Sequence, residues 1–490
     1  MNFVPFPRSR RELRRAALLA GALAAGIVAA GCELPFGPAF KIDRQRLEAT
    51  YIRSPQARVE VRAVWRVKNT GDRPIHGLDV ELPDGKTHAV SQLRAESEGS
   101  EVTPVPTAGR GTVRIAFREP LATGARQEVA ISYALAGMEG GGVVVEEAGF
   151  VLPVGQWAPV LLPPSADGPF ARGGAPPKKW ELAVRVPAGF RVHASGQARG
   201  ETKDAGSIVF RFREPPEERE PFAVGGEFQE QKVAAASREV ILWTRQALPH
   251  DVAQQAAEAT ARTAALYDGE FGGRAEAPGT VRIIECPALQ PCWAVPGAAL
   301  LGGELCAAEF WRSGARTVDR QLALTWLDFR VRPDWRVEPF PMSVLADYAA
   351  DLAAIAREGS DARRRLVHGI LLQLDALEKP RRERAVLGIE LSEPATVRRY
   401  TELKSELFFF ALEDSVGSEI LHHAFEHLRK IYAGEGWRAA DLMAAVNLEI
   451  GLGSDREAGA LFRVWLTETG IPQEFRSRYA GGEKASGSAH

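Results

Sequence analysis

The amino-acid sequence lacks the features that mark several classes of protein. Its formal net charge is -2 at pH 7 and its basic residues are interleaved with acidic ones, so it has no basic stripe that would favour nucleic acid. The apolar run from Ala16 to Ala30 is too short for a comfortable helix across a bilayer about 30 Å thick. Cysteine is scarce, with four in 490 residues, which leaves room for few disulfides.

What is present is the composition of an ordinary globular protein. Hydrophobic residues make up 45% of the chain and charged residues 25%, which is close to average usage. A typical domain contains about 100–200 residues. A chain of 490 residues therefore predicts two or three domains.

The N-terminal sequence resembles an export signal of the bacterial lipoprotein type. A positively charged region precedes the apolar run and contains Arg8, Arg10, Arg11, Arg14 and Arg15. The run ends in Val28-Ala29-Ala30-Gly31-Cys32, which resembles a lipobox. The sequence thus predicts a signal peptide over residues 1–31, lipidation of Cys32 and a linker over 32–45.

The lipidated cysteine implies a membrane partner and a location. The mature chain is expected to be held at the bacterial cell envelope by acyl chains on Cys32. Glu33 stands where inner-membrane retention signals have aspartate, which favours the outer membrane, facing the periplasm. A plain secretory signal is the alternative, and both the general and the twin-arginine export routes stay open.

Three cysteines follow the predicted anchor, Cys286, Cys292 and Cys306. Three thiols allow one disulfide, and an oxidising envelope favours its formation. Cys286 and Cys292 bound a short loop with proline at both ends, so this pair is the easiest to close. A three-thiolate metal site is the alternative.

Hydrophobic periodicity divides the mature chain. Val59 to Val67 alternates apolar and polar residues, and similar runs recur at spacings typical of a sandwich or barrel, so residues 46–233 are predicted to form a β-sandwich. From about Gly359 apolar residues repeat at three and four, which predicts a helical subdomain over 359–478. The polar residues 479–490 are predicted to be a disordered tail.

Between these regions lies a segment that resembles a known family. Arg320-Gln321-Leu322-Ala323-Leu324-Thr325-Trp326-Leu327 is similar to the H-E-L-A-H-Q-W-W helix of the gluzincin zinc aminopeptidases, which include aminopeptidase N. The resemblance places the two metal-binding histidines at Arg320 and Leu324 and the general-base glutamate at Gln321. Glu338 to Tyr348 resembles E-P-W-L-x-E-G-L-A-x-Y, which places the third ligand at Ser343.

Two further functional positions of the family can be located. Gly297 to Gly303 is similar to the G-A-M-E-N-P-G motif, and Leu300 stands where a glutamate would hold the substrate's α-ammonium. Lys404 to Phe408 resembles the segment Y-x-K-G-A-L-F, and Glu402 stands where a tyrosine would face the oxyanion.

The family resemblance implies the fold. It predicts an α+β protein in which residues 234–358 form a thermolysin-like α/β subdomain between the sandwich and the helices. Within it, segments 317–329 and 342–356 are expected to be adjacent helices.

The replacements remove the chemistry that the family uses. Zinc needs imidazole nitrogens, thiolates or carboxylates, and neither a guanidinium nor a leucine has an electron pair to offer. A glutamine cannot take a proton from water at neutral pH. We therefore expect no zinc at Arg320 and Leu324. We also expect Arg320 to pair with Glu402, and the former pocket floor to collapse around Leu300, Leu324 and Leu327.

Two classes of function follow. The first is a catalytically inactive aminopeptidase-like lipoprotein that binds a peptide or protein, or serves as a scaffold, at the envelope. The alternative is a metallopeptidase with a relocated metal site. His423 and His427 lie at the ends of an H-x-x-E-H sequence, the inverted zinc motif, and Glu309, Asp328 and Asp347 are the acidic candidates.

Overall fold

The computed structural model describes residues 40–479 with interior gaps. The gaps are 84–87, 108–110, 138–142, 163–176, 205, 214–220, 272–279, 287–293, 303–309, 312–314, 328–343, 378–383, 388–393, 433–436 and 451–454. The predicted signal peptide, linker and tail, together with Ser343 and Cys292, lie outside the described residues.

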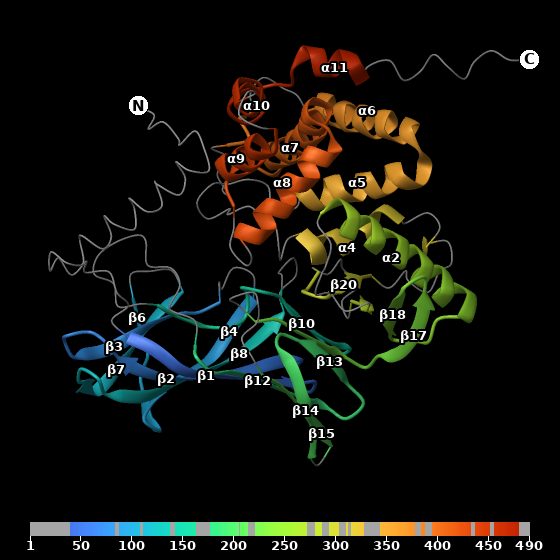
Figure 1. Ribbon diagram of the computed structural model, residues 1–490. Helices are drawn as coiled ribbons and strands as arrows, with labels where there is room; N and C mark the ends of the chain where they lie inside the picture. The colour runs from blue at the N-terminus through green and yellow to red at the C-terminus, as the bar shows by residue number, and fades with distance from the viewer. Residues whose placement is uncertain are drawn as a thin grey trace, which may run out of the picture.

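The N-terminal part is a β-sandwich whose larger sheet has eight strands. In chain order these are β1 (Phe40–Ile52), β2 (Arg58–Asn69), β4 (His88–Ser97), β5 (Ser100–Val102), β8 (Arg126–Gly137), β12 (Trp180–Pro187), β14 (Gln197–Asp204) and β15 (Ser207–Arg213). Their spatial order is β14-β15-β12-β1-β2-β8-β4-β5. Figure 1 shows this sheet as the broad layer at the bottom of the molecule.

Two four-stranded sheets cover the inner face of the large sheet. One has the order β11-β3-β7-β6 and the other β13-β16-β10-β9. Their strands are β3 (Ile75–Glu81), β6 (Val105–Pro106), β7 (Thr112–Leu121), β9 (Val144–Glu146), β10 (Gly149–Leu152), β11 (Val160–Leu162), β13 (Arg191–Ala194) and β16 (Ala223–Gly226).

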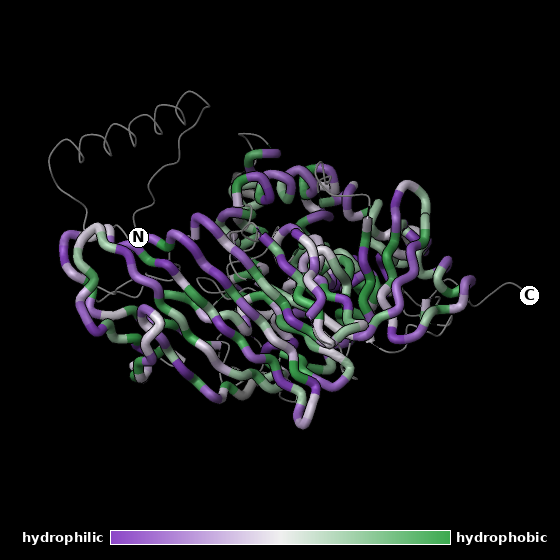
Figure 2. The backbone as a smooth tube through the Cα atoms, turned by 90° about the horizontal axis from the view of Figure 1, so that it is seen from below, coloured by the Kyte–Doolittle hydropathy of each residue, from purple (hydrophilic) through white to green (hydrophobic). Residues whose placement is uncertain are grey.

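Alternation of side chains explains why this layer forms. In β2 every second residue is buried, and Trp65 shares one core with Val80 of β3 and Phe150 of β10. The other face of the strand is polar, and the tubes in Figure 2 accordingly alternate between hydrophobic and hydrophilic residues. A strand with one apolar face must bury it against another layer.

A smaller mixed sheet follows the sandwich. Its strands are β17 (Gln229–Ala235), β18 (Arg238–Thr244), β19 (Thr280–Glu285) and β20 (Ala298–Leu301), in that spatial order. One face packs against helices α2 (His250–Glu270) and α4 (Ala315–Leu327), which contribute to the helical core. The other face, including Ile241 and Trp243, packs against sandwich residues such as Val224.

Helices complete the chain. They are α5 (Val344–Glu358), α6 (Ser360–Leu377), α7 (Ala395–Val416), α8 (Ser418–Ile431), α9 (Ala439–Ile450), α10 (Asp455–Phe462), the π-helical turn η2 (Arg463–Thr467) and α11 (Gln473–Tyr479). They lie at the top of Figure 1, above α4 and the small sheet. In the part of the chain that the structure describes, no helix is long and apolar enough to cross a membrane.

The architecture confirms the predicted α+β class, with β-rich and helical parts in the predicted order. The two helices expected at 317–329 and 342–356 are found at Ala315–Leu327 and Val344–Glu358. Each is displaced by about one half turn from its predicted bounds, a common uncertainty for helix ends.

Candidate functional site

The candidate site lies on the facing surfaces of α4 and α5. Arg320 Nε donates to Asp347 Oδ1 at 2.7 Å, and Arg316 Nε donates to Asp351 Oδ1 at 2.8 Å. The two arginines are four residues apart in α4, and the two aspartates are four residues apart in α5. The order of the partners along α5 is the reverse of the order along α4. Because residues four apart share a helix face, α4 and α5 are antiparallel and joined by a ladder of ion pairs.

Leu324, aligned with the family's second histidine, lies one turn beyond Arg320 on α4. Position 343, aligned with the third ligand, lies outside the described residues. Leu324 is 3% exposed and belongs to the helical core. The predicted convergence of positions 320, 324 and 343 therefore stays a prediction.

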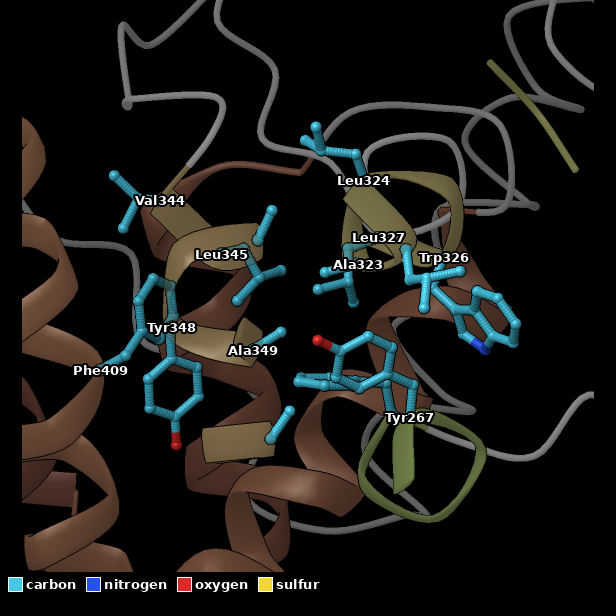
Figure 3. Packing of buried hydrophobic residues seen from close by; sticks show 14 of the residues in the cluster. Tyr267, Ala323, Leu324, Trp326, Leu327, Val344, Leu345, Tyr348, Ala349 and Phe409 are labelled. Carbon is cyan, nitrogen blue, oxygen red and sulfur yellow. The ribbon is translucent and has the colours of Figure 1, made fainter. Parts of the chain in front are cut away.

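Apolar side chains pack between α4 and α5. Figure 3 shows Ala323 and Leu327 of α4 facing Leu345 and Ala349 of α5. All of these side chains are almost fully buried. At about 25 cal/mol per Å² of apolar surface removed from water, this packing holds the two helices together without a metal.

The predicted pairing of Arg320 with Glu402 is wrong. Glu402 Oε2 instead accepts a hydrogen bond from Arg399 Nη1 at 3.4 Å, within α7, and its side chain is 36% exposed. Arg320 is paired with Asp347, whose side chain is 13% exposed. Sequence reasoning could have found this partner, because Asp347 lies four positions after Ser343 in the sequence just as Arg320 lies four positions before Leu324.

The predicted common pocket floor of Leu300, Leu324 and Leu327 is also wrong in part. Leu324 and Leu327 belong to the helical core, as expected. Leu300 of β20 lies in a separate cluster with Val151 and Val224 of the sandwich. Successive strand residues point to opposite faces, so Leu301 faces the helices while Leu300 faces away from them.

A buried charge cluster that the sequence did not reveal lies one turn below Arg320. Arg316 donates to Asp351 and, through Nη2, to Glu406 Oε1 of α7 at 3.1 Å. The Asp351 and Glu406 side chains are 1% and 5% exposed. Burial, followed by the charges of Asp351 and Asp347, raises the pKa of Glu406 well above its usual range in spite of Arg316.

Gln321, which the resemblance aligns with the family's general base, is 8% exposed. Within the described part of the chain, its Oε1 atom is buried without a hydrogen-bond partner. A neutral amide tolerates such burial at a cost of about 1–3 kcal/mol, whereas a carboxylate would cost far more. The surroundings of position 321 therefore suit glutamine better than a charged base.

These residues do not fit zinc. Of the family's ligand positions, Arg320 carries a cation already bound to Asp347, and Leu324 carries a hydrocarbon. Asp347 and Asp351 are carboxylates, but each is engaged by an arginine. Among the residues that the structure describes, no three His, Cys, Asp or Glu side chains gather where one ion could hold them.

In the inverted motif on α8, two of the three residues have charged partners of their own. His423 is 46% exposed and its Nδ1 atom lies 3.8 Å from Glu449 Oε2 of α9. Glu426, the acidic residue of the inverted motif, is bound to Lys430 at 2.7 Å. His427 lies one turn beyond His423 on the same helix. Glu309 and Asp328 lie outside the described residues.

Cys286 is disulfide-bonded and fully buried at the end of β19. Its predicted partner, Cys292, lies outside the described residues, so that pairing stays a prediction.

A β-sandwich followed by a mixed sheet and a helical bundle is the architecture of the M1 zinc metallopeptidases, the class that contains the gluzincin aminopeptidases. The structure is similar to the crystal structure of an M1 zinc metallopeptidase from Deinococcus radiodurans, with a TM-score of 0.57 and 16% identity over 89% of this chain and 96% of that one. A substitution variant of that enzyme bound to a Tyr-Ser-Ala substrate gives 0.56 and 17% over 89% and 95%.

Sequence comparison adds nothing to this structural likeness. No protein-family model and no curated protein matches the chain. At 16–17% identity the likeness establishes the fold, and the residues on that fold have to be judged by their own chemistry.

Proposed function

We propose that this protein is a non-catalytic, aminopeptidase-like lipoprotein of the bacterial cell envelope that binds a peptide or a protein. The observation that carries the proposal is the Arg320–Asp347 ion pair at 2.7 Å. Arg320, a permanent cation, stands at the position that the resemblance aligns with the family's first metal ligand, one turn from the buried Leu324. An arginine there supplies positive charge to the neighbouring carboxylates, so the helix pair does not depend on a metal for charge balance.

The loss of the general base supports the same conclusion independently. Gln321 is neutral at all physiological pH values, so it cannot activate a water molecule. Restoring the metal alone would therefore not restore the family's mechanism, in which a metal-bound water and a base act together.

Retention of the whole fold supports a binding role. A similar structure carries a Tyr-Ser-Ala substrate, and another carries L-arginine. A fold that accommodates peptides in those proteins can bind them here without cleaving them, because contacts that hold the ground state do not by themselves stabilise the transition state.

The predicted anchor defines where such binding takes place. Phe40 begins the first described strand eight positions after Cys32. At no more than about 3.6 Å per residue, this stretch of chain would hold the sandwich within about 30 Å of the membrane surface. The bound partner is therefore expected to be a peptide or protein that reaches the envelope surface.

The proposal is tested by measuring the zinc content of the protein together with its aminopeptidase activity. The full chain, purified with zinc present, should contain far less than one zinc per chain by mass spectrometry and should not cleave aminoacyl anilides that an active M1 peptidase cleaves. Stoichiometric zinc with cleavage would refute the proposal. In that case His423→Ala with His427→Ala decides whether the inverted motif holds the metal, because zinc retained in this double variant must lie elsewhere.

A further inference from the structure

A pocket of about 420 Å³ opens between α2, α4 and α5. Val318 and Asp319 of α4 line it, whereas the family-aligned positions Arg320, Gln321 and Leu324 do not. Small-molecule sites usually have volumes of about 300–1,000 Å³ and combine apolar walls with a few placed polar groups. This pocket is thus a candidate site separate from the former metal position.

The walls of the pocket are apolar. They include Leu266 of α2, Trp311, Val318 of α4 and Ala353 of α5. Trp311 and Val318 are buried beneath the surface, at 5% and 2% exposure. Such walls favour a ligand with a hydrocarbon or aromatic group, which gains about 25 cal/mol per Å² on leaving water.

Two arginines stand at the mouth. Arg262 of α2 is exposed and has no hydrogen bond or ion pair with the described residues. Arg357 of α5 is held by Asp319, with Nη1 2.6 Å from Oδ2. Asp319 is fixed in turn by the Thr263 hydroxyl, which donates to Oδ1 at 2.7 Å. Because a guanidinium has five N–H donors, Arg357 retains donors for a ligand anion.

A further polar side chain, that of Gln255, lines the pocket beside the two arginines. Gln255 lines the same pocket, and its Oε1 atom is buried without a hydrogen-bond partner in the described part of the chain. A buried acceptor without a partner costs about 1–3 kcal/mol, which a ligand N–H would recover once the Gln255 side chain turns its amide oxygen into the pocket. Glu258, also at the mouth, already accepts a hydrogen bond from Gln254 at 3.0 Å.

We infer that this pocket binds an α-amino acid with a large apolar side chain, either free or as the C-terminal residue of a peptide. The carboxylate would lie between Arg262 and Arg357, the α-nitrogen would donate to Gln255, and the side chain would pack against Leu266 and Trp311. Arginine suits a carboxylate because its planar fork can make two parallel hydrogen bonds. This inference does not depend on the proposed function, since the pocket shares no residue with the family-aligned positions.

Calorimetric titration of the full chain tests the ligand chemistry. L-phenylalanine and Gly-Gly-Phe both offer the free carboxylate, whereas L-phenylalaninamide lacks it. At least one of the first two should bind saturably, and the amide should bind at least tenfold more weakly. Binding of Gly-Gly-Phe alone would show that the natural ligand is the C-terminus of a peptide. Binding of both L-phenylalanine and Gly-Gly-Phe would show that a free amino acid is sufficient. Absence of binding by either at millimolar concentration, or equal binding of the amide, would overturn the inference.

Two single substitutions test whether the ligand binds in this pocket. Arg262→Ala removes an exposed side chain and is expected to leave the fold intact while weakening binding at least tenfold, as loss of a charge-assisted hydrogen bond does. Arg211→Ala, on the exposed surface of β15 in the sandwich, is the matched control and should bind as the unmodified chain does. If Arg262→Ala binds as tightly as Arg211→Ala, the ligand does not occupy this pocket and the assignment is wrong.

Discussion

Replacing Arg316 with methionine should destabilise the helix pair strongly at neutral pH. Arg316 is the cation that faces Asp351 and Glu406, at 2.8 Å and 3.1 Å. Methionine keeps an aliphatic stem to cover the same apolar surface but leaves both buried carboxylates without the arginine. The substitution therefore isolates the electrostatic role of the guanidinium.

The burial of the three groups sets the size of the effect. Removing one partner of a fully buried ion pair costs about 3–5 kcal/mol, whereas a fully exposed pair contributes about 0–1 kcal/mol. Asp351 and Glu406 are 1% and 5% exposed, but Arg316 is 48% exposed and partly screened by water. We therefore expect a loss of about 2–3 kcal/mol of unfolding free energy at pH 7.

The loss of stability in the Arg316→Met variant should depend on pH, and the direction of this dependence follows from the pKa of Glu406. Its pKa in the folded chain is raised by burial above the ordinary value of 4.5, so the folded state binds protons that the unfolded state releases. A group of this kind contributes stability below the unfolded pKa, and that contribution is lost as pH rises through the folded pKa. Without Arg316 the folded pKa rises further, so the variant should be most destabilised at neutral pH and approach the unmodified chain near pH 4.

Urea unfolding of the full chain, followed by its helical circular dichroism at pH 4 and pH 7, measures the difference. Arg365→Met is the control, because Arg365 pairs with Glu358 on the surface with side-chain exposures of 62% and 54%. It should cost no more than about 1 kcal/mol at either pH. Equal behaviour of the two variants, or a loss for Arg316→Met that does not shrink at pH 4, would refute this electrostatic account.

Two further substitutions test the apolar core and the membrane anchor. Leu324→Ala should cost about 2–5 kcal/mol of stability, as other large-to-small changes in a core do, because Leu324 is 3% exposed; an unchanged urea midpoint would show that this position still faces a solvent-filled cleft. Cys32→Ser should move the protein from the membrane to the soluble fraction of fractionated cells, because the acyl chains supply the anchoring free energy; unchanged sedimentation with membranes would contradict the predicted lipidation.

Several features could be predicted from the sequence because their causes are local. The alternation from Val59 to Val67 reappears in β2, where every second residue is buried, because successive side chains in a strand point to opposite faces. The bounds of α4 and α5 came instead from the family resemblance, and they lie within about two residues of the observed ends. The side-chain types at the positions aligned with the family's metal ligands are likewise read from the sequence, and the loss of zinc there stays a prediction.

Other features depended on which distant residues meet. Asp347 is 27 residues from Arg320 and became its partner because α4 and α5 pack antiparallel in one register. Leu300 lies in a strand whose four residues are all buried, so no alternation reveals which face it occupies.

The sequence by itself determined which side-chain types stand at the positions aligned with the family's metal ligands, and its periodicity together with the family resemblance predicted the order of strands and helices. Only the tertiary structure decided which residues pair with these positions. Arg316, Asp351 and Glu406 come from three different helices, and their meeting depends on the packing of α7 against α4 and α5. Burial at that junction raises the pKa of Glu406, and burial is a property of the packed chain rather than of any segment.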